Sequence, residues 1–109
     1  MRKTTLALVM KLAASFAFAG ESPPAPPPDR QRELVQFVRQ DCGACHGLGL
    51  AGGLGPSLLP SALEQWPPEA LALTIHEGRP DTPMPPWRRF LSEAETLWIA
   101  QRLKEGFPR

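Results

Sequence analysis

The chain has 109 residues, 42% of them hydrophobic and 21% charged, with a formal net charge of +1. These values indicate one domain of ordinary composition, and the small net charge leaves no basic excess to neutralise nucleic-acid phosphates. Two cysteines permit one bridge at most, which excludes a disulfide-rich scaffold, and fourteen prolines exclude a long uninterrupted helical bundle unless they are segregated.

The N-terminal segment has the pattern of an export signal. A basic start precedes a mostly apolar run over residues 6–19, and the small residues Ala17 and Ala19 form a cleavage site. These features predict a secretory signal peptide over residues 1–19, so the cysteines of the mature chain meet an oxidising compartment. The alternative is an uncleaved membrane anchor. It is disfavoured because Lys11 leaves no apolar span of ~20 residues, and we expect no membrane anchor after cleavage.

Residues 20–28 are predicted to be a proline-rich linker. Five of the seven residues from Ser22 to Pro28 are proline, and such a run adopts an extended polyproline-II conformation that is expected to pack against nothing. The folded domain is therefore expected to span residues 29–109. A domain of about 80 residues buries little apolar surface and usually needs a staple besides its core.

No segment alternates with period two, so we predict an all-α fold. Asp29 is expected to cap the first helix, and Ser92-x-x-Glu95 forms a capping box at the start of the last. The loops over residues 47–66 and 79–91 are long for so small a domain, which suggests that a further group fills its middle. Three helices are predicted, over about residues 29–41, 67–78 and 92–106.

The segment Cys42-Gly43-Ala44-Cys45-His46 has the haem-attachment pattern C-x-x-C-H. Residues three apart at the end of a helix lie on the same side, so Cys42 and Cys45 can reach the two vinyl groups of one porphyrin and form thioethers. His46 follows directly and is placed to ligate the iron through its imidazole. We therefore predict one covalently attached haem c per chain, and this haem supplies the staple that the domain needs.

Three other roles for the cysteines fit the sequence less well. A thioredoxin-like redox pair needs a βαβ context, which the predicted elements do not offer. A zinc site is one ligand short when the motif supplies two cysteines and one histidine. A structural disulfide across a four-residue loop gains little entropy.

The second long loop supplies a candidate for the other axial position. Met84 lies among four prolines and is the only methionine left once residues 1–19 are removed. A thioether is a soft, neutral ligand that suits low-spin haem iron, and the prolines limit the conformations that the loop can sample. Two alternatives stay open: Met84 fills the core, or His76 at the end of the second helix is the ligand.

Arginines surround the Met84 loop at Arg79, Arg88 and Arg89. They are predicted either to pair with haem propionates or to steer an acidic partner, unless they are ordinary solvated side chains. Trp87 either donates its indole N–H to a propionate or closes the pocket.

With these residues in place, the chain resembles a class I c-type cytochrome over residues 30–105. The resemblance is carried in order by C-x-x-C-H, Gly55-Pro56-Ser57-Leu58, the Met84 loop and a C-terminal helix. It implies a small all-α fold in which three main helices and long loops surround one haem and the Pro56 carbonyl accepts the His46 N–H. The first and last helices would then cross through Leu34, Val38 and Trp98.

The loop sequences Gly52-Gly53-Leu54-Gly55-Pro56 and Met84-Pro85-Pro86-Trp87 carry a narrower resemblance. They are similar to the small monohaem cytochromes encoded with haem-cd-type nitrite reductase in denitrifying bacteria. This implies a periplasmic monomer that carries single electrons to nitrite reductase and is not an enzyme. The alternative role is that of an accessory haem protein in maturation of the reductase or its d-type haem. A haem enzyme with an open iron would require Met84 to be displaced.

Overall fold

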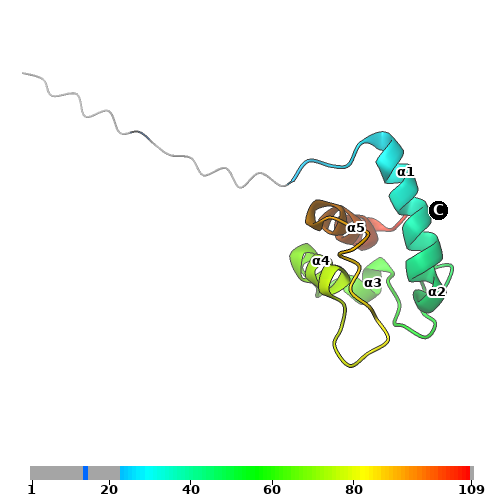
Figure 1. Cartoon of the computed structure of the whole chain (residues 1–109). Coiled ribbons are helices and arrows are strands. Elements are labelled where there is room, and N and C mark those ends of the chain that lie inside the picture. Colours follow the sequence, from blue (N-terminus) through cyan, green and yellow to red (C-terminus); the bar gives the residue numbers. More distant parts are fainter. Residues whose placement is uncertain (1–13, 15–22, 109) are drawn as a thin grey trace, which may run out of the picture.

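The computed structural model describes residue 14 and residues 23–108. The predicted signal peptide, apart from residue 14, and residues 20–22 of the predicted linker lie outside the described residues. In the described part the chain is helical and contains no strand, as expected for an all-α protein (Figure 1). None of the helices described is both long and apolar enough to cross a membrane. In chain order the elements are α1 (Pro28–Phe37), η1 (Val38–Cys42), α2 (Gly43–His46), α3 (Pro60–Leu63), α4 (Pro68–Glu77) and α5 (Glu93–Glu105).

The first three elements form one helical stretch that ends at the C-x-x-C-H motif. The predicted first helix continues past Asp41, because the π-helical turn η1 and then α2 carry it to His46. The predicted cap at Asp29 is wrong, since Pro27 is the N-cap and Pro28 is in the first turn. The fixed φ angle of proline favours a helix start at that point. Asp29 then lies in the first turn, where its charge suits the helix dipole.

The second and third predicted helices are confirmed as α4 and α5. Ser92 and Glu95 form both hydrogen bonds of the predicted capping box at the start of α5. Gly78 ends α4 and Gly106 ends α5 with φ angles of 71° and 105°. These positive angles favour glycine, which has no Cβ to clash with the backbone.

One hydrophobic core joins the helices, and α5 packs against both α4 and α3. Leu34, Val38 and Trp98, which the resemblance assigned to the helix crossing, are all buried in this core. Arg30 of α1 also donates a hydrogen bond to Glu95 of α5 at 2.5 Å, which fastens the two helices together at their N-terminal ends. The other buried apolar residues are Leu50, Leu63, Leu71, Ala72, Ile75, Leu91, Ile99, Ala100 and Leu103.

The first long loop is not structureless, because it contains the short helix α3. The Lys104 ammonium of α5 donates to the carbonyls of Leu63 at 2.8 Å, Glu64 at 3.3 Å and Trp66 at 2.6 Å. These carbonyls lie at and just after the end of α3. The last carbonyls of a helix have no N–H partner within the helix, so the ammonium supplies one. A helix of four residues covers about one turn, so sequence periodicity cannot reveal it.

Part of the proline-rich segment packs against the domain, contrary to the expectation that the linker packs against nothing, although residues 23–25 and Pro27 are exposed. Pro26 is buried, and its carbonyl accepts a hydrogen bond from the Gln31 side-chain amide at 2.8 Å. The start of this segment lines a small pocket together with Leu97 and Trp98 of α5. A polyproline-II segment has a solvated backbone and apolar rings, so it can cover an apolar helix face without a ladder of hydrogen bonds.

Candidate haem-binding site

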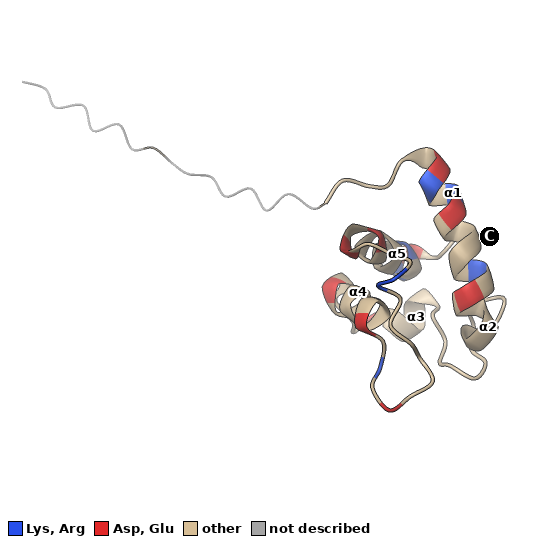
Figure 2. Cartoon of the chain, viewed as in Figure 1, with Lys and Arg blue, Asp and Glu red and all other residues tan. Residues whose placement is uncertain are grey.

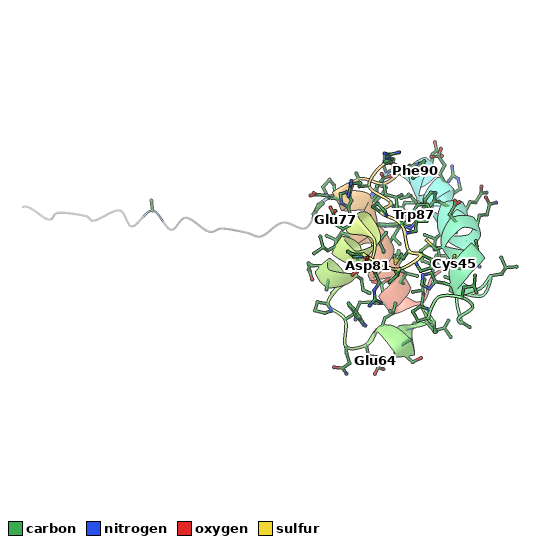
Figure 3. The ribbon with its side chains drawn as sticks, turned by 60° about the horizontal axis from the view of Figure 1, so that its bottom comes forward. Cys45, Glu64, Glu77, Asp81, Trp87 and Phe90 are labelled. Carbon is green, nitrogen blue, oxygen red and sulfur yellow. The ribbon has the colours of Figure 1, made fainter. Side chains whose placement is uncertain are left out.

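The helical stretch ending at His46 presents the two cysteines differently. Cys42 packs against the hydrophobic core, whereas Cys45 is exposed, and both thiols are free in the structure. Burial, assisted by the nearby charge of Asp41, raises the pKa of the Cys42 thiol to about 12. The Cys42 side chain is therefore a neutral thiol at physiological pH. Figure 3 labels Cys45 beside the helical stretch that carries it.

His46 is held by the loop that follows it. Its Nδ1 lies 2.7 Å from the carbonyl oxygen of Pro56, the contact that the resemblance implies. A carbonyl oxygen only accepts, so the Nδ1 carries the hydrogen, and in the neutral ring the Nε2 then has a free lone pair. That tautomer is the one in which Nε2 can ligate a metal.

Gly55 leaves room for the His46 ring. A Cβ at position 55 would stand 2.8 Å from both Nδ1 and Cε1 of the imidazole, closer than non-bonded atoms approach. The Gly55 amide also donates to the carbonyl of Cys45 at 2.8 Å. Backbone and ring therefore meet here without an intervening side chain. The sequence marked Gly55 only as a neighbour of Pro56, because a steric requirement across the loop leaves no local signal.

The Met84 loop is folded against the end of α4. Gly78 has its backbone close to that of Met84 and Pro85: an added Cβ would lie 2.6 Å from the Pro85 carbonyl carbon and 2.8 Å from the Met84 oxygen. The Arg79 amide donates to the Met84 carbonyl at 3.2 Å. Met84 itself is half-buried and packs against the core. The loop that carries the thioether is thus held against the end of α4 by a hydrogen bond and by close backbone packing.

Trp87 lies beside the helix that leads to the cysteines. Its ring meets that of Phe37 edge to face, with centroids 5.3 Å apart, and Phe90 lies 6.1 Å from it on another side. The Trp87 backbone amide donates to the Ile75 carbonyl of α4 at 3.2 Å. Trp87 therefore bridges α1 and α4, between which Figure 3 also places it. Both predicted roles of Trp87, closing the pocket and donating to a propionate, stay predictions.

His76, the rival ligand, lies in the last turn of α4, and its side chain is only 17% exposed. Its Nδ1 lies 3.1 Å from a carboxylate oxygen of Glu77, whose other oxygen accepts from Arg88 at 2.9 Å. The backbone of His76 also accepts the amide of Arg88. The ring thus contacts the Glu77 carboxylate that also pairs with Arg88, while Met84 is in contact with the core.

Acidic as well as basic side chains lie near the Met84 loop, whereas the sequence drew attention only to its arginines. Within residues 23–108, Arg88 is the only one of Arg79, Arg88 and Arg89 that forms an ion pair, and its partner is Glu77. The exposed Asp81 adds a negative charge to the loop between α4 and α5, where both signs appear in Figure 2. The loop joining α2 to α3 carries no charged residue, and its Leu54 is 95% exposed.

The groups described here fit a covalently attached haem. Two thiols lie three residues apart at a helix end, an imidazole has its Nε2 lone pair free, and a thioether is carried by an anchored loop. By contrast, the described residues contain no group of three or more His, Cys, Asp or Glu side chains that could hold a metal ion.

Known proteins resemble this chain in sequence and in fold. Residues 29–101 match the family described as cytochrome C oxidase, cbb3-type, subunit III. Cytochrome c55X of Pseudomonas aeruginosa is 48% identical over 107 residues, covering 96% of this chain and 90% of the relative. The solved structure of the c-type cytochrome NirC is 52% identical, with a TM-score of 0.73, and the match covers 74% of this chain and 95% of NirC. The described fold is thus that of a small c-type cytochrome.

A larger protein contains a similar domain. The dihydro-heme d1 dehydrogenase of Pseudomonas aeruginosa is 37% identical over the whole of this chain, which spans only 20% of that protein. A solved structure of dihydro-heme d1 dehydrogenase NirN, in complex with DHE, matches with a TM-score of 0.61 and 38% identity. That match covers 68% of this chain and 16% of the NirN chain.

Proposed function

We propose a function from one premise: the chain belongs to the c-type cytochromes, in the same family as cytochrome c55X and NirC. As a member of that family it is an electron-transfer protein and not an enzyme. We propose more specifically that it carries single electrons in the periplasm, as a monomer, to a haem-cd-type nitrite reductase. Bound haem supplies an iron that exchanges one electron.

The proposal assigns a role to each group at the site. Cys42 and Cys45 would hold one haem c through thioethers, and His46 and Met84 would be the axial ligands. The 2.7 Å contact between His46 Nδ1 and the Pro56 carbonyl carries the proposal, because it orients the imidazole and leaves Nε2 free. If His46 and Met84 both hold the iron, the metal would have no position left for a substrate, as an electron carrier requires.

The experiment is electron transfer between purified proteins. The reduced holoprotein is mixed with oxidised haem-cd-type nitrite reductase in a stopped-flow spectrometer, and the oxidation of the cytochrome is followed. The proposal expects a rate that rises in proportion to reductase concentration. No transfer on the timescale of reductase turnover would remove nitrite reductase as the partner. Repeating the measurement with Arg79 and Arg89 changed to glutamate tests whether these cations contribute to docking.

One observation favours a second candidate function. The relative that dehydrogenates dihydro-haem d1 includes a region similar to this entire chain. A free-standing cytochrome of this kind could thus serve an oxidation step in d-type haem maturation by accepting electrons. Deletion of the gene separates the two functions. Loss of nitrite reduction with normal d-type haem content supports the donor role, whereas reduced d-type haem content supports the maturation role.

A further inference from the structure

The turn that precedes Met84 is shaped by Pro80 and Asp81. The amide of Thr82 donates to the carbonyl of Arg79 at 3.2 Å, which closes a four-residue turn. Proline occupies the second position of this turn, and Asp81 occupies the third with φ of 62°. A proline followed by a left-handed residue is the pattern of a type II turn. The chain therefore reverses direction directly before the methionine.

The hydroxyl group of Thr82 bridges both sides of this turn. Its Oγ1 donates to the Arg79 carbonyl at 2.7 Å and accepts the Met84 amide at 3.3 Å. A hydroxyl can donate and accept at once, so one side chain joins the residue before the turn to the residue after it. The Arg79 amide completes the ring of contacts by donating to the Met84 carbonyl at 3.2 Å.

The Met84 amide differs from its neighbours in having an N–H group. Residues 83, 85 and 86 are prolines and carry no N–H, so Met84 has the only backbone donor between Thr82 and Trp87. Thr82 Oγ1 is the acceptor that this donor meets. If that contact is lost, no other N–H within residues 83–86 can replace it, and the hydrogen bond from the Arg79 amide to the Met84 carbonyl is left to hold the loop.

We propose that Thr82 is the positioning residue for Met84, holding the thioether in the place from which it reaches the haem iron. The inference rests on the proposed assignment of Met84 as axial ligand, and not on the identity of the redox partner. Thr82 is exposed and belongs to no part of the core. Removing its hydroxyl should therefore release the loop locally and leave the fold intact.

The consequence is measurable with a competing ligand. Added imidazole can bind ferric iron only in the fraction of molecules whose Met84 loop is open, so its apparent affinity reports that fraction. Loss of one or two hydrogen bonds should raise the open fraction by about fivefold to thirtyfold. We expect Thr82→Val holoprotein to bind imidazole more tightly by that factor and to show a weaker long-wavelength band of methionine-ligated ferric haem.

Two further variants make the test specific. Thr82→Ser keeps the hydroxyl and should behave as the wild type. Thr74→Val removes another threonine hydroxyl, one that donates to the Ala70 carbonyl within α4 at 2.8 Å, and should leave imidazole binding unchanged. Equal affinities in wild type, Thr82→Val and Thr74→Val would overturn the proposal, as would a serine variant that matches valine.

The ligand assignment is checked in the same titration. Met84→Ala should bind imidazole more tightly than any threonine variant, since no thioether competes. If Met84→Ala instead matches the wild type, Met84 is not the ligand, and both the assignment and the role of Thr82 are wrong. If Met84→Ala responds and Thr82→Val does not, the assignment stands and only the role of Thr82 is refuted.

Discussion

The imidazole of His46 donates its Nδ1 hydrogen to the carbonyl oxygen of Pro56 across 2.7 Å, although the two residues are ten apart in the sequence. The fixed φ of proline removes one of the two backbone rotations that aim this carbonyl, so the acceptor has fewer directions to sample. Ring orientation is set by the chain itself, which leaves Nε2 ready for a metal.

This arrangement predicts a steric effect at Gly55. A Cβ there would stand 2.8 Å from two imidazole atoms, so Gly55→Ala should tilt His46 away from the Pro56 carbonyl. We expect less haem per polypeptide and a loss of about 1–3 kcal/mol in the free energy of unfolding of the holoprotein. The measurements are haem content after purification and chemical denaturation.

Gly49→Ala is the matched control. No atom lies within 4 Å of a Cβ added at position 49, and its φ angle is not positive. Both variants add one methyl group to the same loop region, so the difference between them reports the contact with His46. Normal haem content and stability in Gly55→Ala would show that the ring can move without consequence.

Features set by neighbouring residues could be predicted from the sequence, whereas contacts across a loop or turn could not be predicted from the residues alone. The motif from Cys42 to His46 and the capping box at Ser92 are local patterns, and the helices that carry them lie where expected. The contact between His46 and the Pro56 carbonyl was predicted from the family resemblance, and the structure contains it. The bridging hydroxyl of Thr82 carried no such signal, because two hydrogen bonds across a turn require the turn to be known first.

For the proline-rich segment, the sequence predicted too little contact with the domain. Composition alone predicts an extended polyproline-II conformation, and composition cannot tell whether an apolar surface is available to it. Here the face of α5 around Trp98 is available, and Pro26 is buried. The length of chain free of the domain is therefore shorter than the composition suggested.

Shortening this segment tests its contribution. A holoprotein whose mature chain begins at Pro27 lacks the buried Pro26 and the carbonyl that accepts from Gln31. We expect its free energy of unfolding to fall by about 1–2 kcal/mol, from one lost hydrogen bond and the uncovered apolar surface. Gln31→Ala removes only the hydrogen bond and should show the smaller part of this loss. A shortened chain as stable as the full one would restore the linker interpretation.

The choice between Met84 and His76 predicts opposite results for two variants. Met84→Ala should abolish the weak long-wavelength band of the ferric holoprotein and lower its reduction potential, because a thioether favours the ferrous state. His76→Ala should change neither, since that ring pairs with Glu77 at the end of α4. Absorption spectroscopy and redox titration provide the readouts. A wild type that lacks this band, and whose spectrum and potential change in His76→Ala but not in Met84→Ala, would assign the ligand to His76.

The contact between Arg30 and Glu95 predicts how stability depends on pH. The hydrogen bond from Arg30 is the main reason that the pKa of Glu95 lies below its ordinary value, and burial opposes it. A carboxyl whose pKa is lowered by folding stabilises the fold above its unfolded pKa, which is about 4.3 for Glu. That stabilisation is lost as the pH falls through the lower pKa of the folded state.

Glu95→Gln isolates this contribution, because glutamine can also complete a capping box with Ser92. We expect the variant to be less stable than the wild type by about 1 kcal/mol at pH 7, a value reduced by the partial exposure of Arg30. The difference should shrink as the pH falls below about 4.

Glu93→Gln changes an exposed carboxylate in the same first turn and should leave the unfolding free energy nearly unchanged. Denaturation at several pH values measures all three proteins, and comparing them cancels the pH dependence of haem ligation. A constant difference between wild type and Glu95→Gln across the range would mean that the charge of Glu95 contributes nothing.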